Sequence, residues 1–180
     1  MTTILLARHG ETDWNRDGRW QGWADPPLND AGREQARELA EQLRSMQFDA
    51  VYSSDLRRAH ETAEIVAAPH GVPVVTDVGL REIDVGSWSG LTRAEIEERF
   101  GRDAERTDGE TRDQHRERVV AAFERIARAH VGERILVVSH GGSLGALRRH
   151  AGVEVEGRLG NCAVFELHFR DERFVAPSVS

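Results

Sequence analysis

The chain has 180 residues, a length typical of one domain with a single core. With 39% hydrophobic and 31% charged residues, it has the composition of a soluble globular protein and not of a disordered or fibrous one. The formal net charge of −7 argues against a nucleic-acid-binding surface, and no apolar run has the length of a membrane span. The single cysteine, Cys162, excludes an intramolecular disulfide and a cysteine-based zinc cluster. Since residues 1–3 lack the positive charge of a secretion signal, we expect a cytoplasmic protein, and its oligomeric state stays open.

The first half of the chain predicts three strands and two helices. The apolar run 4–7 indicates a buried strand, 50–52 a second strand and 72–76 a weaker third one. Asn29 is expected to cap the first helix and Ser54 the second. Apolar residues recur at the spacing of one helical face in both helices, as Ala36, Leu39, Ala40 and Leu43 and then as Leu56, Ala59, Ala63 and Val66.

The second half predicts three further helices around one strong strand. Thr92 with Glu95, and Thr111 with Gln114, have the spacing of a capping box at two helix starts. The run 135–138 is apolar on both faces, as is typical of a central parallel strand covered by helices. The apolar residues expected to be buried on these helices are Val119, Phe123, Ile126, Leu144 and Leu147.

The end of the chain is expected to form a β-hairpin at a sheet edge, from residues 163–169 and 174–175. Strands that alternate with helices predict a three-layer α/β/α sandwich with a mostly parallel central sheet and right-handed connections. We expect one domain over residues 1–180, with a short cap segment near 92–111.

Polar motifs follow three of the predicted strands, where a parallel sheet binds its ligands. Arg8 and His9 follow the first strand, residues 53–58 the second, and residues 139–142 the strongest one. Two histidines and several arginines therefore converge on one edge of the sheet. Each motif also precedes a turn or helix whose free N–H groups can face an anion. The pattern predicts a phosphate site in which an imidazole can act as the nucleophile.

These motifs, in this order, resemble those of the histidine phosphatase superfamily, and more narrowly its phosphoglycerate-mutase-like branch. In the branch that includes acid phosphatases and phytases, an Asp typically follows the second histidine motif, whereas Gly141 and Gly142 follow His140 here. The resemblance therefore places the proton donor on the loop of Glu82. The matching stretches are Arg8-His9-Gly10-Glu11-Thr12, residues 53–58 with Ala59, Thr62 and Ala63, Leu80-Arg81-Glu82, and Ser139-His140-Gly141.

The resemblance implies a phosphomonoesterase for small phosphorylated metabolites that uses a phosphohistidine and needs no metal ion or other cofactor. His9 would attack phosphorus, with its other ring nitrogen donating to a carbonyl that fixes the tautomer. Arg8 and Arg58 would hold the phosphoryl oxygens as planar donors, and a charged His140 would add another. Glu82 would protonate the leaving oxygen and then take a proton from water. Lesser candidates for phosphate contacts are Asn15, Gln21, Gly22 and Gly141.

Several residues have two interpretations. Glu11 is a rival acid because it is close to His9 in sequence. Glu110 fits the charge expected near a helix start better than a site role. His115 lies early in a helix near the motif loops, and its role is open. The role of three tryptophans is also open: Trp14, Trp20 and Trp23 either line the pocket or pack within the long loop.

Three alternative functions accompany the phosphatase hypothesis. A cofactor-dependent phosphoglycerate mutase shares the chemistry, but family mutases have Arg-His-Tyr after the Glu, and here Ile83-Asp84-Val85 follows Glu82. A catalytically silent module that only binds phosphorylated ligands is disfavoured, because it would not need a nucleophile and an acid together. A phosphoprotein phosphatase stays open, as does the choice among sugar phosphates, phosphoglycerate derivatives, nucleoside monophosphates and the nucleotide-loop precursor of cobalamin. The short polar segment 101–110 predicts a thin lid and therefore broad specificity.

Overall fold

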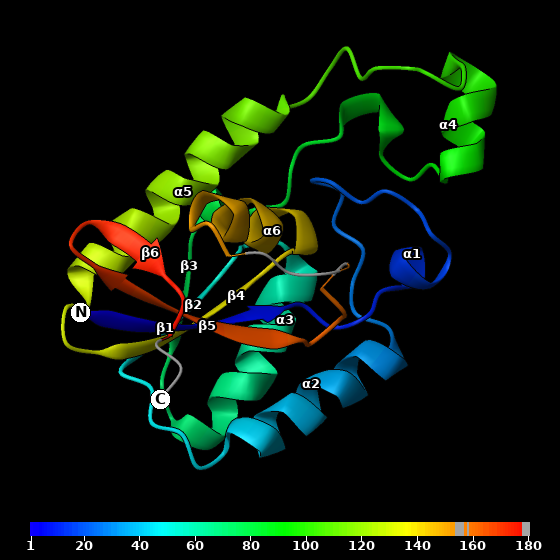
Figure 1. The fold of residues 1–180 in the computed structure, drawn as a ribbon. Helices are drawn as coiled ribbons and strands as arrows, with labels where there is room; N and C mark the ends of the chain where they lie inside the picture. Colours follow the sequence, from blue (N-terminus) through cyan, green and yellow to red (C-terminus); the bar gives the residue numbers. More distant parts are fainter. Residues whose placement is uncertain (154–156, 158, 178–180) are drawn as a thin grey trace.

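A twisted six-stranded sheet with the strand order β3-β2-β4-β1-β5-β6 forms the centre of the molecule, as the computed structural model shows (Figure 1). The structure describes residues 1–153, 157 and 159–177. The pairs β1·β4, β4·β2 and β2·β3 are parallel, whereas β1·β5 and β5·β6 are antiparallel. The strands are β1 (Thr2–Arg8), β2 (Ala50–Ser53), β3 (Val74–Thr76), β4 (Arg134–Ser139), β5 (Val164–Arg170) and β6 (Arg173–Val175).

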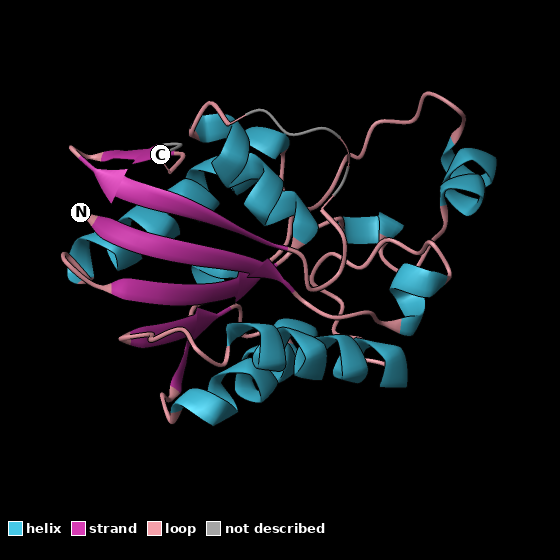
Figure 2. Cartoon of the chain, turned by 60° about the horizontal axis from the view of Figure 1, so that its bottom comes forward, coloured by secondary structure: helices cyan, strands magenta, loops and turns pink. Residues whose placement is uncertain are grey.

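Helices cover both faces of this sheet, so that the predicted three-layer α/β/α sandwich is confirmed (Figures 1 and 2). The helices α2 (Asp30–Leu43) and α3 (Arg57–Ala67) pack on one face, and α5 (Arg112–Ala129) and α6 (Gly141–His150) on the other. Two short helices, α1 (Asp13–Arg16) and α4 (Arg93–Phe100), lie away from the sheet on the right of Figure 1. The 3₁₀ helices are η1 (Ala68–His70), η2 (Val78–Leu80) and η3 (Gly86–Trp88).

The buried residues explain why the sheet has this order. Residues 135–138 of β4 are fully buried, because they face a helical layer on each side and a parallel strand at each edge. Leu136 pairs with Leu5 on one side and with Val51 on the other. The predicted closing hairpin forms from β5 and β6 at one edge of the sheet. β3 is shorter than expected and starts at Val74, directly after Pro73, which lacks the N–H that a ladder needs.

Helix caps were predicted well where the side chain is local. Asn29 accepts a hydrogen bond from the Gly32 amide at 2.8 Å, and the capping boxes of Thr92 and Thr111 both form. The Ser54 cap is wrong, because α3 begins three residues later, after an extended Leu56. The Arg57 amide at the start of α3 instead donates to Asp25 at 2.7 Å, and Asp25 lies 32 residues away in sequence. A cap from a distant loop leaves no local spacing to detect.

The loop after β1 lies directly on the first turn of α2. A Cβ atom placed on Gly10 would be 2.4 Å from the Gly32 carbonyl oxygen, and one on Gly32 would be 2.1 Å from the Glu11 carbonyl oxygen. Both distances are far below van der Waals contact, so the two backbones touch with no room for a side chain. No described helix is long and apolar enough to cross a lipid bilayer.

Candidate active site

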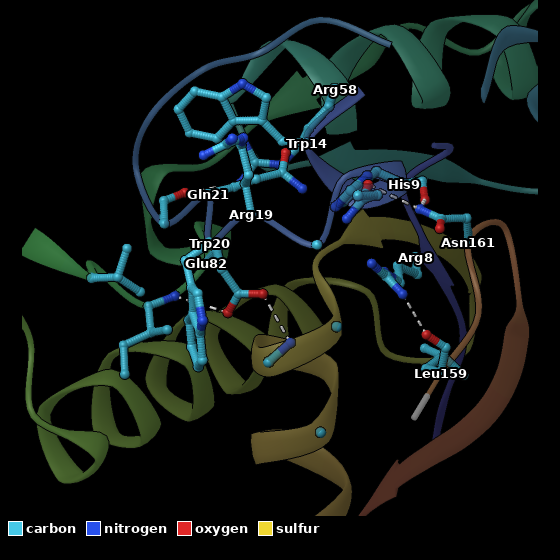
Figure 3. A pocket seen from close by; sticks show the side chains of 18 of the residues that line it. Arg8, His9, Trp14, Arg19, Trp20, Gln21, Arg58, Glu82, Leu159 and Asn161 are labelled. Carbon is cyan, nitrogen blue, oxygen red and sulfur yellow. Dashed lines mark hydrogen bonds between the residues drawn. The ribbon is translucent and has the colours of Figure 1, made fainter. Parts of the chain in front are cut away.

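A pocket of about 610 Å³ lies where β1 and β4 end, at the carboxyl edge of the sheet (Figure 3). Arg8 pairs with Ser139 in the register of these parallel strands, and the His9 amide donates to the Ser139 carbonyl at 3.0 Å. The sheet thus brings together two motifs that are 131 positions apart, His9 and His140, with ring centroids 5.2 Å apart. All the predicted site residues line this pocket except His140.

His9 has the hydrogen bond that a nucleophile of this type needs. Its Nδ1 atom lies 2.7 Å from the Gly10 carbonyl oxygen, which can only accept, so Nδ1 carries the proton and donates. The other ring nitrogen, Nε2, is then unprotonated in the neutral ring. Burial, followed by the charges of Arg58 and Arg8, lowers the pKa of His9 well below its usual value. His9 is therefore neutral at pH 7, with Nε2 available for attack.

Arg58 is a buried cation that the backbone holds in place. Its guanidinium donates to the Ala24 carbonyl at 2.8 Å and to the Gly22 carbonyl at 2.9 Å. Burial lowers its pKa to about 10, which keeps it charged at neutral pH. Its neighbour Arg57 is exposed. Arg8 reaches the pocket from the end of β1 and donates to the Leu159 carbonyl at 2.6 Å.

His140 is fully buried next to His9, beneath the pocket wall. Within the described part of the chain, neither of its ring nitrogens has a hydrogen-bond partner. Burial, then Arg58 and His9, lower the pKa of His140 well below its usual value. Without an anion in the site, burial and these neighbours favour the neutral ring, and the charged His140 expected beside a bound phosphate stays a prediction.

Glu82 is held by backbone amides at the pocket wall. One carboxylate oxygen accepts from the Ile83 amide and the other from the Gly142 amide in the first turn of α6, both at 2.9 Å. Glu11, the rival acid, does not line the pocket and accepts instead from the Asn29 side chain at 2.9 Å. The geometry favours Glu82 as the acid.

An ion pair between Arg118 of α5 and Glu110, which precedes that helix, holds the loop of Glu82 in place. Arg118 donates to the carbonyls of Gly79, Arg81 and Glu82 at 3.0–3.1 Å. Two further bonds of 2.7 Å join Arg118 to Glu110. Glu110, directly before the N-cap of α5 and outside the pocket lining, is thus the partner of a structural arginine. Glu110 lies outside the helix, before an extended N-cap, so helical spacing does not predict this pair.

His115 contacts the catalytic loop from the same helix. Its Nε2 atom lies 3.0 Å from the Ser143 hydroxyl and 3.8 Å from a Glu82 carboxylate oxygen. Ser143 donates its only hydroxyl proton to the Arg81 carbonyl at 2.8 Å, so Nε2 of His115 must be the donor to Ser143. Burial lowers the pKa of His115, which keeps the ring neutral behind the acid.

The long loop between α1 and α2 forms another wall of the pocket (Figure 3). Asn15 accepts a hydrogen bond from the Thr12 backbone amide at 3.2 Å and Gln21 from the Thr12 hydroxyl at 3.1 Å, each through its side-chain oxygen. Gly22 has φ +53°, and a Cβ there would lie 2.5 Å from a Val85 methyl carbon. A glycine at this position lets the loop lie against Val85, and the Gly22 carbonyl accepts a hydrogen bond from Arg58.

The tryptophans divide between the two interpretations. Trp14 and Trp20 line the pocket, whereas Trp23 packs outside it and donates to the Glu82 carbonyl at 2.8 Å. Trp20 also meets Trp88 edge-on, with ring centroids 5.8 Å apart. An ion pair of 2.8 Å between Arg19 and Glu95 ties the loop to α4. The loop borders the site, whereas no residue of the segment 92–111 lines the pocket.

Sequence reasoning missed several residues of the site. Asn161 donates to the His9 carbonyl at 3.0 Å, and no local motif marks it. Thr62, which the sequence analysis names only as part of a matching stretch, accepts a hydrogen bond from the Gly10 amide at 3.1 Å. Arg148 and Arg149 line the pocket, and their positions seven and eight residues after Gly141 are a helical spacing that the sequence does contain. In the described ranges, no three His, Cys, Asp or Glu side chains group as a metal ion would require.

Comparisons with known proteins identify the family of the chain. The family model of the histidine phosphatase superfamily (branch 1) matches residues 4–179. The metal-independent phosphoserine phosphatase of Arabidopsis thaliana is 40% identical over 194 residues, covering 100% of this chain and 82% of that protein.

Two solved structures have the same fold. A mycobacterial glucosyl-3-phosphoglycerate phosphatase in complex with VO3 superposes with a TM-score of 0.86 at 29% identity, covering 96% of this chain and 95% of that one. A phosphoglycerate mutase from Bacillus anthracis str. Sterne has a TM-score of 0.89 at 26% identity, covering 99% and 92%. The chain therefore belongs to branch 1 of the histidine phosphatase superfamily and is a histidine phosphatase with the phosphoglycerate-mutase-like fold.

Proposed function

We propose that this protein hydrolyses small phosphomonoesters through a phosphohistidine on His9, without a metal ion. The observation that carries the proposal is the bond of 2.7 Å between Nδ1 of His9 and the Gly10 carbonyl. It leaves Nε2 unprotonated in a pocket that is also lined by Arg8, Arg58 and Glu82. A neutral nucleophile, two fixed cations and an acid are the parts that phosphoryl transfer requires.

In the first step, Nε2 of His9 attacks phosphorus and the bond from phosphorus to the ester oxygen breaks. Glu82 gives its proton to that departing oxygen, so that an alcohol and not an alkoxide leaves. Arg8 and Arg58 hold the phosphoryl oxygens while negative charge moves across them. Because backbone carbonyls already fix Arg58, little reorganisation is needed at the moment of transfer.

In the second step, water attacks the phosphohistidine and Glu82 takes a proton from it. The bond between phosphorus and Nε2 breaks, inorganic phosphate leaves, and His9 returns to its neutral form. Glu82 ends the cycle with the proton that it had lost, so no outside proton donor is needed. The cations of the site meet the phosphoryl charge in the way that a divalent ion does in metal-dependent phosphatases.

The names of two relatives support hydrolysis over mutase activity. The Arabidopsis relative is named as a metal-independent phosphatase, and the mycobacterial structure is of a phosphatase in complex with VO3. Vanadate can adopt the five-coordinate shape of phosphorus during transfer, so we expect it to inhibit this enzyme as well.

Trapping the intermediate tests the proposal. Brief incubation with a phosphomonoester labelled in its phosphoryl group, followed by an alkaline quench, should leave acid-labile label on the protein. His9→Ala should remove both the label and turnover, whereas His168→Ala should keep both, because His168 pairs with Glu166 on β5 away from the pocket. Prior incubation with a chelator should leave the rate unchanged. Undiminished turnover by His9→Ala, or a chelator-induced loss that one metal restores, would count against the mechanism.

A further inference from the structure

A buried histidine that the proposed mechanism does not use lies behind Glu82. His115 is in the first turn of α5, is 4% exposed and does not line the pocket. Its Nε2 atom lies 3.8 Å from the carboxylate oxygen Oε1 of Glu82. A buried titratable ring so close to an acid affects how that acid holds its proton. The effect depends on the charge of the ring and on the groups to which it is bonded.

A chain of two hydrogen bonds joins the His115 ring to the Glu82 loop. The Ser143 hydroxyl donates its proton to the Arg81 carbonyl at 2.8 Å. Ser143 can therefore only accept from the ring, and Nε2 of His115 donates to it at 3.0 Å. This bond fixes the proton of the neutral ring on Nε2. The chain ends at the residue directly before Glu82, so it can control where the acid lies.

The main chain of this loop has other supports. Arg118 donates to three of its carbonyls, and Trp23 donates to the Glu82 carbonyl at 2.8 Å. The carboxyl group itself accepts from the Gly142 amide at 2.9 Å, and Gly142 is the neighbour of Ser143 in the first turn of α6 (Figure 3). Loss of the histidine should therefore leave the loop folded and disturb mainly the carboxyl group.

The surroundings of His115 favour a neutral ring. Burial is the largest effect and lowers the pKa of His115. The ring also lies near the start of α5, where the helix dipole opposes a positive charge. Nearby carboxylates favour the charged ring and nearby arginines oppose it. The titratable groups that act on the ring are Glu82, Glu110, Arg118, Arg149 and His140.

A neutral ring at this distance suits a proton donor. A cationic ring 3.8 Å from the carboxyl group would reduce the fraction of protein with a protonated Glu82 by about 10–1000-fold. The acid would then lose its proton before the departing oxygen takes it. A neutral N–H group avoids this loss and still holds the start of α6 and the Arg81 carbonyl in place through Ser143.

We propose that His115 is a positioning residue for the acid: its neutral Nε2–H group fixes the Glu82 carboxyl through Ser143 and keeps positive charge away from it. This inference rests on the proposed phosphatase function and adds a residue to its acid step. His115 does not line the pocket, so it acts through Glu82 and not on the substrate. Its effect should therefore depend on how much the departing oxygen needs a proton.

Three substitutions of His115 test the inference with two substrates. Propyl phosphate needs a protonated departing oxygen, whereas nitrophenyl phosphate does not. His115→Leu removes the donor and should slow phosphorylation of His9 by propyl phosphate about tenfold, and by nitrophenyl phosphate less than about twofold, in rapid-quench measurements. His115→Gln keeps a neutral donor and should restore the propyl phosphate rate to within about threefold of wild type. His115→Arg keeps donors but adds a permanent charge, so it should be at least as slow as His115→Leu with propyl phosphate.

A double-mutant cycle tests the route through Ser143. Ser143→Ala should be at least as slow as His115→Leu with propyl phosphate, and the double variant no slower than Ser143→Ala, because both changes break one chain. His60→Leu is the matched control, since His60 is a helical histidine 3.4 Å from the Ser53 hydroxyl and outside the pocket lining. It should keep both rates within about twofold of wild type. Circular dichroism checks folding, and the comparison of His115→Gln with His115→Arg decides the question if His115→Leu does not fold.

The two possible failures are distinguishable. Absence of phosphohistidine and of turnover in the wild-type protein would overturn the phosphatase function itself. Normal phosphohistidine formation in the wild type, with equal slowing of both substrates or no slowing in His115→Leu, would overturn the role of His115 alone. Equal propyl phosphate rates in His115→Arg and His115→Gln would do the same, because the charge at position 115 would then not affect the acid.

Discussion

The two ends of the central sheet hold their histidines differently: His140 at one end is fully buried, and His130 at the other is partly buried. At the carboxyl ends of the strands, His140 has no hydrogen-bond partner for either ring nitrogen among the described residues, and its neighbours are Arg58, His9 and Arg8. At the amino ends, His130 has both ring nitrogens engaged. Its Nε2 lies 2.9 Å from the Tyr52 hydroxyl, and its Nδ1 lies 2.5 Å from a Glu133 carboxylate oxygen.

The difference separates a structural histidine from a functional one. A carboxylate and a phenol satisfy His130, so nothing remains for a ligand to supply. The other end of the sheet instead gathers arginines around histidines, an arrangement that repels protons and attracts anions. Unsatisfied buried polar groups are costly, and they persist where a bound molecule completes them. Each of the following predictions tests this contrast.

The largest difference in kcat/KM is expected between variants in which one histidine is replaced at each end of the sheet. His140→Asn should reduce kcat/KM by about 10²–10³-fold, as is typical when one preorganised donor to a transition state is removed. His130→Gln should leave kcat/KM within about twofold of wild type and lower only the free energy of unfolding, by about 1 kcal/mol. Steady-state kinetics and urea unfolding of both variants measure this. Comparable activity losses in the two variants would erase the contrast.

A smaller effect, which depends on the substrate, is expected at Glu82. An alkyl phosphate needs its departing oxygen protonated, whereas nitrophenolate leaves without help. Glu82→Gln should therefore slow phosphorylation by an alkyl phosphate about 10–100-fold more than by nitrophenyl phosphate, as rapid-quench measurements would detect. Glu11→Gln is the matched control, because Glu11 bonds to Asn29 and not to the pocket. Equal slowing with both substrates would remove Glu82 from the role of acid.

The smallest effect concerns stability and pH. His9 and His140 have pKa values well below the value of about 6.5 in the unfolded chain, so the unfolded state binds protons first as the pH falls. Stability from these two residues is complete above about pH 6.5 and is lost below it, by up to about 1.4 kcal/mol per pH unit for each residue. Urea unfolding at pH 7, 6 and 5 should show this loss.

The variant His140→Asn provides the comparison for that measurement. Its free energy of unfolding should fall less steeply between pH 6 and 5 than that of wild type, by about 1 kcal/mol per pH unit. Other titrating groups contribute equally to both proteins and cancel. An unchanged slope would show that His140 is already protonated in the folded protein.

Much of the fold follows from local patterns. The apolar run of β4 and the one-sided faces of α2 and α3 are short-range signals, and the structure confirms each of them. The Asn29, Thr92 and Thr111 caps depend on residues at most three positions apart, so the sequence alone was sufficient for them. Motifs at strand ends also converge as expected, because a parallel sheet brings its carboxyl ends to one edge.

Most of the misses have one physical cause, which is long-range contact. Asp25 caps α3 from 32 residues away, and Asn161 bonds to the carbonyl of His9 across 152 positions. Burial and four neighbours from three segments, Arg58, His9, Arg8 and His115, lower the pKa of His140, and no single motif describes their sum. Arg148 and Arg149 were missed for another reason, since their helical spacing from Gly141 was visible but not followed.

The contact between Gly10 and Gly32 limits which substitutions this sequence can tolerate during evolution. Position 32 is an ordinary position inside α2, where alanine would favour the helix by about 1 kcal/mol. Here the same change would place a methyl group 2.1 Å from the Glu11 carbonyl oxygen, in the loop that carries His9. A residue that never touches a ligand is thus as constrained as the nucleophile, and a mutation that stabilises most helices would damage this one. In evolution the two glycines are expected to persist or change together.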